Sequence, residues 1–367
     1  MNPATPPEHP HLSGSALPPP EAQPAMAAAG PGGIPPQVLM WAERPPLAAP
    51  VDYARITRPG HRWWRILVAL LLLLGIWVVA QIVLAVGFMV VGVLAGWDPL
   101  WFMAGLMEFP AIRMTPGALL YTNLVLAAFI PATIISIRVA HGVRRGFVHS
   151  VAGRFRWGLF GQLTLLLLPI WLLYVVGATW AAGGSLASIN PHPEMWALMA
   201  VVWLTTPLQS AGEEYAFRGW LLQNIGGFFA VRALAWGVPI IVSAVTFGLM
   251  HGSLDPWVLG PLMIMAAAAG VMAWRSGGLE AAIALHSLNN VIVMTLTLTM
   301  GGFDDAFIST ETTGSPGDLA GAFLGHAAAV AVVWWWVKRR GVPNTTIVDP
   351  RRPLMVRGTP PPPGHPP

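Results

Sequence analysis

Residues 66–96 read ILVALLLLLGIWVVAQIVLAVGFMVVGVLAG, a run without a charged side chain. About 20 apolar residues are enough to cross a bilayer as a helix, so this longer run predicts a span that tilts or protrudes. We expect no cleavable signal peptide, because no apolar run lies within the first 30 residues. The chain as a whole agrees, since 55% of its 367 residues are hydrophobic and 10% are charged, against about 25% charged in soluble proteins.

Further apolar runs follow the first, and together they predict an all-α polytopic membrane protein with a bundle of about eight transmembrane helices. The expected spans are residues 66–96, 118–139, 157–182, 195–222, 235–252, 256–274, 279–300 and 317–337.

The connections between these spans predict the orientation of the chain. Arginine and lysine in short connections favour the cytoplasm. In an eight-span model the basic clusters before the first span, after the second, fourth and sixth spans, and after the eighth all fall on one side. We therefore expect a multi-pass protein of the plasma membrane with both termini in the cytoplasm.

Both ends of the chain are rich in proline and poor in core-forming residues. Residues 1–60 and 341–367 are therefore expected to be disordered tails, able at most to bind unknown partners as proline-rich ligands. Between them, residues 61–194 hold the first three spans, residues 195–300 hold spans four to seven, and residues 301–340 hold the last span.

The composition also excludes several kinds of chemistry. Cysteine is absent, which rules out a disulfide framework, an iron–sulfur cluster, a thiolate zinc site and a cysteine nucleophile. The net charge of +4 comes from basic residues that lie beside apolar spans. These basic residues indicate the topology of the chain in a membrane. We therefore expect the lipid bilayer to surround the chain, and we expect no nucleic-acid partner.

Glu213, Glu214 and Arg218 lie inside the fourth expected span. A charged side chain at the centre of a membrane helix costs roughly 2.5–3.5 kcal/mol on the translocon scale, so such residues usually mark a pathway or a site. Glu214 and Arg218 are four residues apart and share a helix face, which predicts an intrahelical ion pair. Glu213 has no such partner, and an unpaired carboxylate suits a general base as well as a proton relay.

Other spans contribute further polar residues. His251 follows Phe247 by one helical turn in the fifth span, and His286 and Asn290 share a face of the seventh. With Glu213 they are the groups needed to activate a water and to stabilise an oxyanion. Two imidazoles and a carboxylate are also nearly the ligand set of a catalytic zinc site. Periodicity alone leaves both readings open, together with a proton-coupled transporter.

Three motifs occur in these spans, in the order EEYAFR (213–218), FGLMH (247–251) and HSLNN (286–290). They resemble the EExxxR, FxxxH and HxxxN motifs of the CPBP family of intramembrane proteases, also called the CAAX protease and bacteriocin-processing (ABI) family, which includes the type II prenyl-protein protease. The resemblance covers about residues 195–300.

The resemblance implies an intramembrane endopeptidase that hydrolyses a peptide bond of a membrane-associated protein or peptide. It assigns water activation to Glu213, with His251 assisting, and oxyanion stabilisation to His286 and Asn290. The residues that it leaves to support the site are Glu214, Arg218 and Phe247.

The role of a metal is the main alternative within this reading. The chain has no HExxH motif and carries an asparagine in the constellation, so a metal-independent glutamate mechanism is favoured and no cofactor is expected. In the alternative, zinc binds to Glu213, His251 and His286, as in the metalloprotease description first given to the family. A non-catalytic membrane scaffold or immunity protein with the same fold is the remaining reading.

The expected depth of His251 needs a local explanation. A fifth helix that begins near Ala235 would carry His251 away from the depth of Glu213, at about 1.5 Å per residue. Proline is favoured in the first turn of a helix. We therefore expect the fifth helix to begin at Pro239.

Overall fold

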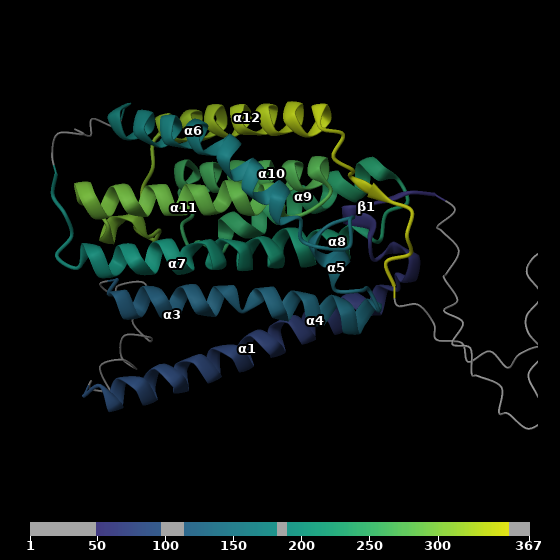
Figure 1. The fold of residues 1–367 in the computed structure, drawn as a ribbon, viewed down its shortest axis with the longest axis horizontal. Coiled ribbons are helices and arrows are strands. Elements are labelled where there is room, and N and C mark those ends of the chain that lie inside the picture. Colours follow the sequence, from purple (N-terminus) through teal and green to yellow (C-terminus); the bar gives the residue numbers. More distant parts are fainter. Residues whose placement is uncertain (1–48, 97–113, 182–188, 352–367) are drawn as a thin grey trace, which may run out of the picture. The chain divides into compact units, whose positions relative to one another are not determined.

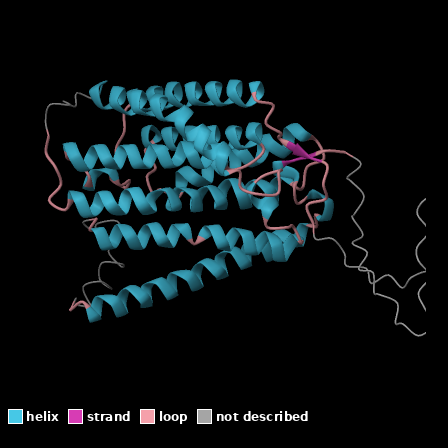
Figure 2. Cartoon of the chain, viewed as in Figure 1, coloured by secondary structure: helices cyan, strands magenta, loops and turns pink. Residues whose placement is uncertain are grey.

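The computed structural model describes residues 49–96, 114–181 and 189–351, and in these ranges the chain is a bundle of long helices (Figures 1 and 2). The predicted all-α polytopic class is confirmed. The long helices are α1 (Trp63–Leu94), α3 (Pro116–Ala127), α4 (Phe129–His141), α6 (Trp157–Ala181), α7 (Met195–Glu214), α9 (Arg232–Leu249), α10 (Pro256–Ser276), α11 (Glu280–Met300) and α12 (Pro316–Arg339).

Within the described residues, seven helical segments are long and apolar enough to cross a membrane. They are α1, α3 with α4, α6, α9, α10, α11 and α12. The remaining expected span, the fourth, also forms a helix, α7, but its second half carries threonine, glutamine, serine and two glutamates and is less apolar. The least apolar of the expected spans is therefore the one that carries the glutamates.

Helix α7 packs against α3 on one side and α11 on the other, so two of the three motif helices are neighbours (Figure 1). The approach to α3 is closest at Gly212, where a Cβ atom would lie 2.0 Å from the carbonyl oxygen of Leu126. Small residues allow membrane helices to approach this closely. The residue directly before Glu213 therefore sets the spacing between α7 and α3.

Helix α7 continues into a π-helical segment, Tyr215–Leu221, and then into the short helix α8 (Leu222–Gly226). Wider π turns are rare and are frequent at functional sites. Arg218 lies inside this segment, fully buried.

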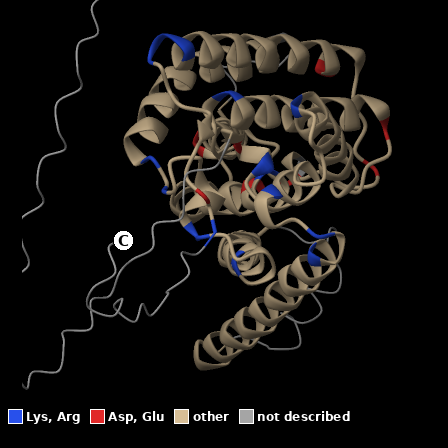
Figure 3. Cartoon of the chain, turned by 90° about the vertical axis from the view of Figure 1, so that its right-hand side faces the viewer, with Lys and Arg blue, Asp and Glu red and all other residues tan. Residues whose placement is uncertain are grey.

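One end of the bundle, which we call the basic end, is where α1, α6, α9 and α11 begin and α4, α10 and α12 end. Figure 3 views the molecule from this end and shows arginine and lysine segments on several neighbouring elements. Here the short strands β1 (Val51–Asp52) and β2 (Thr345–Thr346) pair antiparallel, and the short helix α5 (Gly146–His149) packs nearby.

The expected boundaries of the tails are wrong on both sides. Residues 51–60 pack on the bundle, because Tyr53 and Ile56 are apolar enough to be fully buried there. The C-terminal segment to residue 351 is held by the β1–β2 pairing and by a backbone hydrogen bond from Arg144 to Pro350. Residues 1–48 and 352–367, with the expected binding of partners by these tails, lie outside the described residues.

The expectation for the fifth helix is also wrong. Helix α9 begins at Arg232, and Pro239 lies inside it. Proline is tolerated inside a membrane helix because neighbouring groups can satisfy the backbone that it frees. His251 lies just beyond the end of α9, in a turn that contains Gly252 with a φ of +85°.

Candidate active site

Three motif side chains meet at one carboxylate oxygen. Glu214 Oε1 accepts a hydrogen bond from Arg218 Nη1 at 2.9 Å and another from His286 Nδ1 at 2.8 Å. Glu214 and Arg218 are fully buried, and His286 nearly so. The intrahelical ion pair expected between Glu214 and Arg218 therefore forms, and it also binds α7 to α11.

This contact fixes the state of His286. A carboxylate paired with a buried arginine only accepts hydrogen bonds, so the proton of His286 is on Nδ1. The other ring nitrogen, Nε2, lies 3.4 Å from Glu213 Oε2, beyond the usual hydrogen-bond range of about 2.7–3.2 Å. The Glu213 and His286 side chains thus face each other across this gap.

The two adjacent glutamates differ in exposure. The side chain of Glu213 is 14% exposed and that of Glu214 is fully buried. Glu213 makes no hydrogen bond with any residue that the structure describes. Its carboxylate is therefore the accessible one of the pair, open to a small molecule such as water.

The side chain of His251 contacts Phe247. Its Nδ1 donates to the backbone carbonyl of Phe247 at 2.8 Å, and the two rings lie 4.8 Å apart. The Phe247 ring also contacts the His286 ring at 5.7 Å and the Arg218 guanidinium at 4.9 Å. Within the described residues, His251 has no hydrogen bond or ion pair with Glu213, and Phe247 connects it to the cluster. His286 is thus the direct neighbour of Glu213.

Asn290 binds to α7 one turn before the glutamates. Its Nδ2 donates to Gln209 Oε1 at 3.1 Å and to Ser210 Oγ at 3.3 Å. Its Oδ1 accepts from Asn289 at 3.0 Å. Gln209 and Ser210 lie outside the three motifs, although Gln209 precedes Glu213 by four residues and so shares its helix face.

The donor set does not fit the zinc alternative. No group of three or more His, Asp or Glu side chains that could hold a metal ion occurs in the described part of the chain. His251 and His286 each use Nδ1 in a hydrogen bond and keep Nε2, and the Phe247 ring contacts both imidazole rings.

A helical bundle that places two glutamates, an arginine and a histidine between its central helices has the features of an integral membrane protein with a reactive site inside it. Residues 192–292 match the family model described as type II CAAX prenyl endopeptidase Rce1-like. This region contains all three motifs, and the match supports the resemblance of this region to the CAAX protease family of intramembrane proteases. Neither a curated protein nor a solved structure matches the chain.

Proposed function

We propose that this protein is a glutamate-type intramembrane endopeptidase in which Glu213 activates the attacking water. The observation that carries the proposal is the sequence of contacts from Arg218 and Glu214 to His286 and on to Glu213. It places an accessible carboxylate beside the imidazole of His286, whose tautomer is set by the hydrogen bond from Nδ1 to Glu214. In catalytic triads, too, a third group orients the imidazole beside the reacting group.

In this mechanism a water binds beside Glu213 and the scissile carbonyl. Glu213 takes a proton as the water oxygen attacks the carbonyl carbon. The C–N bond then breaks, and the same proton passes to the leaving amine, so that Glu213 returns to its carboxylate form. His286 Nε2 faces Glu213 and can share the proton during this cycle.

The oxyanion that forms needs hydrogen-bond donors. The proposal assigns this task to the amide groups around Asn290, and to His286 Nε2 once it has received the proton that Glu213 takes from the water. His251 assists from the far side of Phe247, a secondary role that its contacts support. Glu214 acts as a positioning residue for His286, and Arg218 supplies the positive charge that pairs with Glu214.

The proposal includes the orientation of the chain and its substrate class. The basic end faces the cytoplasm of a plasma membrane, because basic residues favour that side, and both ends of the described chain lie there. His286 follows the first residue of α11 by six positions, which corresponds to about 9 Å along a helix. The substrate is therefore a membrane-associated protein or peptide with its cleaved bond in the cytoplasmic half of the bilayer.

The test is cleavage of a library of peptides and small membrane proteins by purified wild type and Glu213→Gln. Loss of a general base lowers the rate by about 10²–10⁴-fold, and we expect kcat/KM to fall in this range while the thermal midpoint stays unchanged. The control is Glu311→Gln, which makes the same change at an exposed loop position.

Other outcomes separate the alternatives. Full activity of Glu213→Gln would overturn the proposal. Activity that chelation removes and zinc restores would favour the zinc alternative. Proton-coupled flux without a peptide product would identify a transporter, and an unchanged phenotype of Glu213→Gln in a biological assay would identify a scaffold.

A further inference from the structure

A chain of hydrogen bonds between side chains connects three helices beside the site. Trp171 of α6 donates from Nε1 to Asn289 Oδ1 at 3.3 Å, and Asn289 Nδ2 donates to Asn290 Oδ1 at 3.0 Å. Asn290 Nδ2 in turn donates to Gln209 Oε1 of α7 at 3.1 Å. The chain runs from the buried indole of Trp171 to the helix face that carries Glu213.

The direction of this series of hydrogen bonds is fixed by Trp171, its first donor. A carboxamide can present either its oxygen or its nitrogen, and the hydrogen-bond network decides which. An indole N–H only donates, so Asn289 must present its oxygen to Trp171 and its NH₂ group to Asn290. Asn290 must then accept with its oxygen and donate toward α7. Each amide inherits its orientation from the one before it.

Ser210 reinforces the last step. Its hydroxyl donates to Gln209 Oε1 at 3.2 Å and accepts from Asn290 Nδ2 at 3.3 Å. Gln209 Oε1 therefore accepts two hydrogen bonds, and the two N–H groups of Asn290 both have partners. Asn290 has no N–H left to offer to a substrate in this arrangement.

Gln209 Nε2 is the amide nitrogen on the Glu213 face of α7, and neither of its N–H groups has a partner among the described residues. This atom is not fully buried. Gln209 is 7% exposed, whereas the next residue, Ser210, is fully buried. Gln209 lies one helical turn before Glu213 on the same face of α7, and Glu213 is the accessible carboxylate.

We propose that Gln209 is the amide that donates to the substrate: its Nε2 binds the carbonyl oxygen of the scissile peptide bond. Asn290 is then a positioning residue that acts through Gln209 Oε1. This inference rests on the proposed endopeptidase function and names a further residue of the same site. Donors aimed at the developing oxyanion stabilise the transition state more than the ground state.

The decisive variant is Gln209→Glu. A glutamate keeps the length of the side chain and an oxygen that accepts from Asn290 and Ser210, but it has no NH₂ group. Loss of one oxyanion donor lowers kcat by about 10²–10³-fold, and we expect such a fall with an unchanged thermal midpoint. The matched control is Gln162→Glu, the same change at an exposed position of α6, which should leave kcat/KM unchanged.

A second variant, Gln209→Met, keeps the proposal testable where Gln209→Glu fails to fold. Gln209→Met has a similar length and no charge, and it should show the same loss in kcat. Asn289→Leu removes the connection to Trp171 while Gln209 remains, and it should show a smaller loss, about tenfold, because the orientation of the amides is no longer fixed.

The failure of this inference is distinguishable from that of the proposed function. If wild type cleaves and both Gln209 variants cleave equally well, Gln209 is not the donor and the endopeptidase proposal stands. If both Gln209 variants are inactive only because their thermal midpoints collapse, the role of Gln209 is structural and the inference is overturned. If wild type cleaves nothing, both proposals fall.

Discussion

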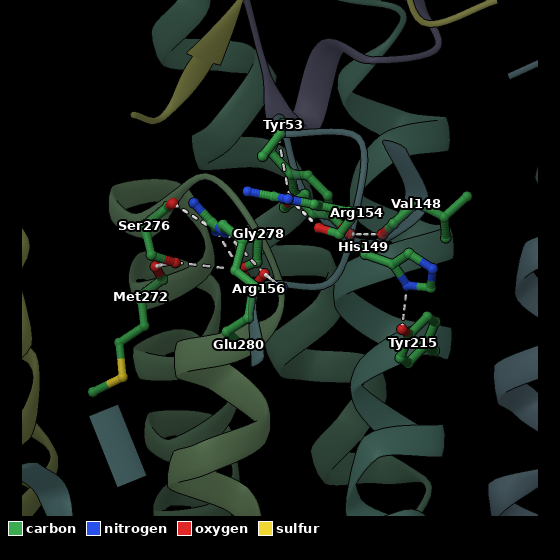
Figure 4. A network of polar contacts seen from close by, with 12 residues as sticks. Tyr53, Val148, His149, Arg154, Arg156, Tyr215, Met272, Ser276, Gly278 and Glu280 are labelled. Atoms are coloured by element: carbon green, nitrogen blue, oxygen red, sulfur yellow. Dashed lines mark hydrogen bonds and ion pairs between the residues drawn. The ribbon is translucent and has the colours of Figure 1, made fainter. Parts of the chain in front are cut away.

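Two buried ion pairs in this protein are built differently. At the basic end, Glu280 Oε1 accepts from the backbone N–H and from Nε of Arg156 at 2.9 Å each, and Oε2 accepts from Nη2 at 2.7 Å (Figure 4). The same Nη2 donates to the carbonyl of Ser276 at 2.9 Å. In the candidate site, one oxygen of Glu214 receives both hydrogen bonds, from Arg218 and His286.

The two pairs differ in how many of their buried polar atoms lack a hydrogen-bond partner among the described residues. In the pair at the basic end, both oxygens of Glu280 have partners and Arg156 Nη1 has none. In the candidate site, Glu214 Oε2 and the Nε and Nη2 atoms of Arg218 have none. A well-satisfied buried network makes a structure rigid, whereas a poorly satisfied one is costly and needs a functional reason. We infer that Glu280 and Arg156 stabilise the fold, and that Glu214 and Arg218 serve the site.

The largest expected effect is on stability, at Glu280. Removing one partner of a buried ion pair costs about 3–5 kcal/mol because the other charge stays buried without compensation. Glu280→Ala should therefore lower the free energy of unfolding by this amount, measured by thermal or denaturant unfolding in detergent. The exposed Glu311→Ala is the control and should have no such effect.

The double variant Glu280→Leu with Arg156→Leu sharpens this prediction. Replacement of a whole buried pair by apolar residues is often neutral for stability, so the double variant should recover the fold together with peptide cleavage. A stable but inactive double variant would contradict the structural role of this pair.

The next effect is on activity, at Glu214. Glu214→Gln removes the charge that orients His286 and balances Arg218, so kcat/KM should fall by on the order of 10²–10⁴-fold, as for other groups that fix a catalytic histidine. The free energy of unfolding should also fall, by about 1–3 kcal/mol, because a buried charged donor loses its partner. Glu213→Gln should show the activity loss without the stability loss. Equal stability losses in the two variants would break the distinction between the adjacent glutamates.

The sequence predicts the parts of this molecule that depend on local composition. Apolar runs define the helices, and the i and i+4 spacing of Glu214 and Arg218 predicts their ion pair, because both follow from helix geometry alone. The three motifs indicate the family.

Contacts between distant segments could not be predicted in this way. The partner of Glu213 is His286 because α7 packs on α11, and only the packing decides which of two imidazoles comes close. Glu280 has no partner within its own helix, and its arginine lies 124 positions away in the chain. The burial of Tyr53 likewise depends on the bundle that covers it. Helix spacing places Gln209 on the same face as Glu213, but an uncharged amide in an apolar span is only weak evidence of a functional residue.

The smallest expected effect is a pH dependence of stability at the basic end. His149 contacts the hydroxyl of Tyr215 (Figure 4). Burial lowers the pKa of His149; the nearby Glu280 acts in the opposite direction, and Arg145 lowers the pKa further. The folded protein therefore favours the neutral ring, and the unfolded chain binds more protons below the ordinary histidine pKa of about 6.5. Stability from this group is present above that pH and is lost as the pH falls through it toward the lower pKa of the folded state.

We expect the thermal midpoint of wild type to fall between pH 7.5 and pH 5.5, and His149→Gln to show a shallower fall over the same range. His192→Gln, at the opposite end of the bundle, is the control and should keep the wild-type slope. Cleavage by His149→Gln at pH 7.5 should stay within a few-fold of wild type, since the polar contacts at the basic end stabilise the fold and do not involve the reacting groups. Tyr215 directly follows Glu214. A large activity loss without a change in the pH dependence of stability would therefore show that the His149–Tyr215 contact belongs to the candidate site. The distinction between a structural basic end and a functional site would then fall.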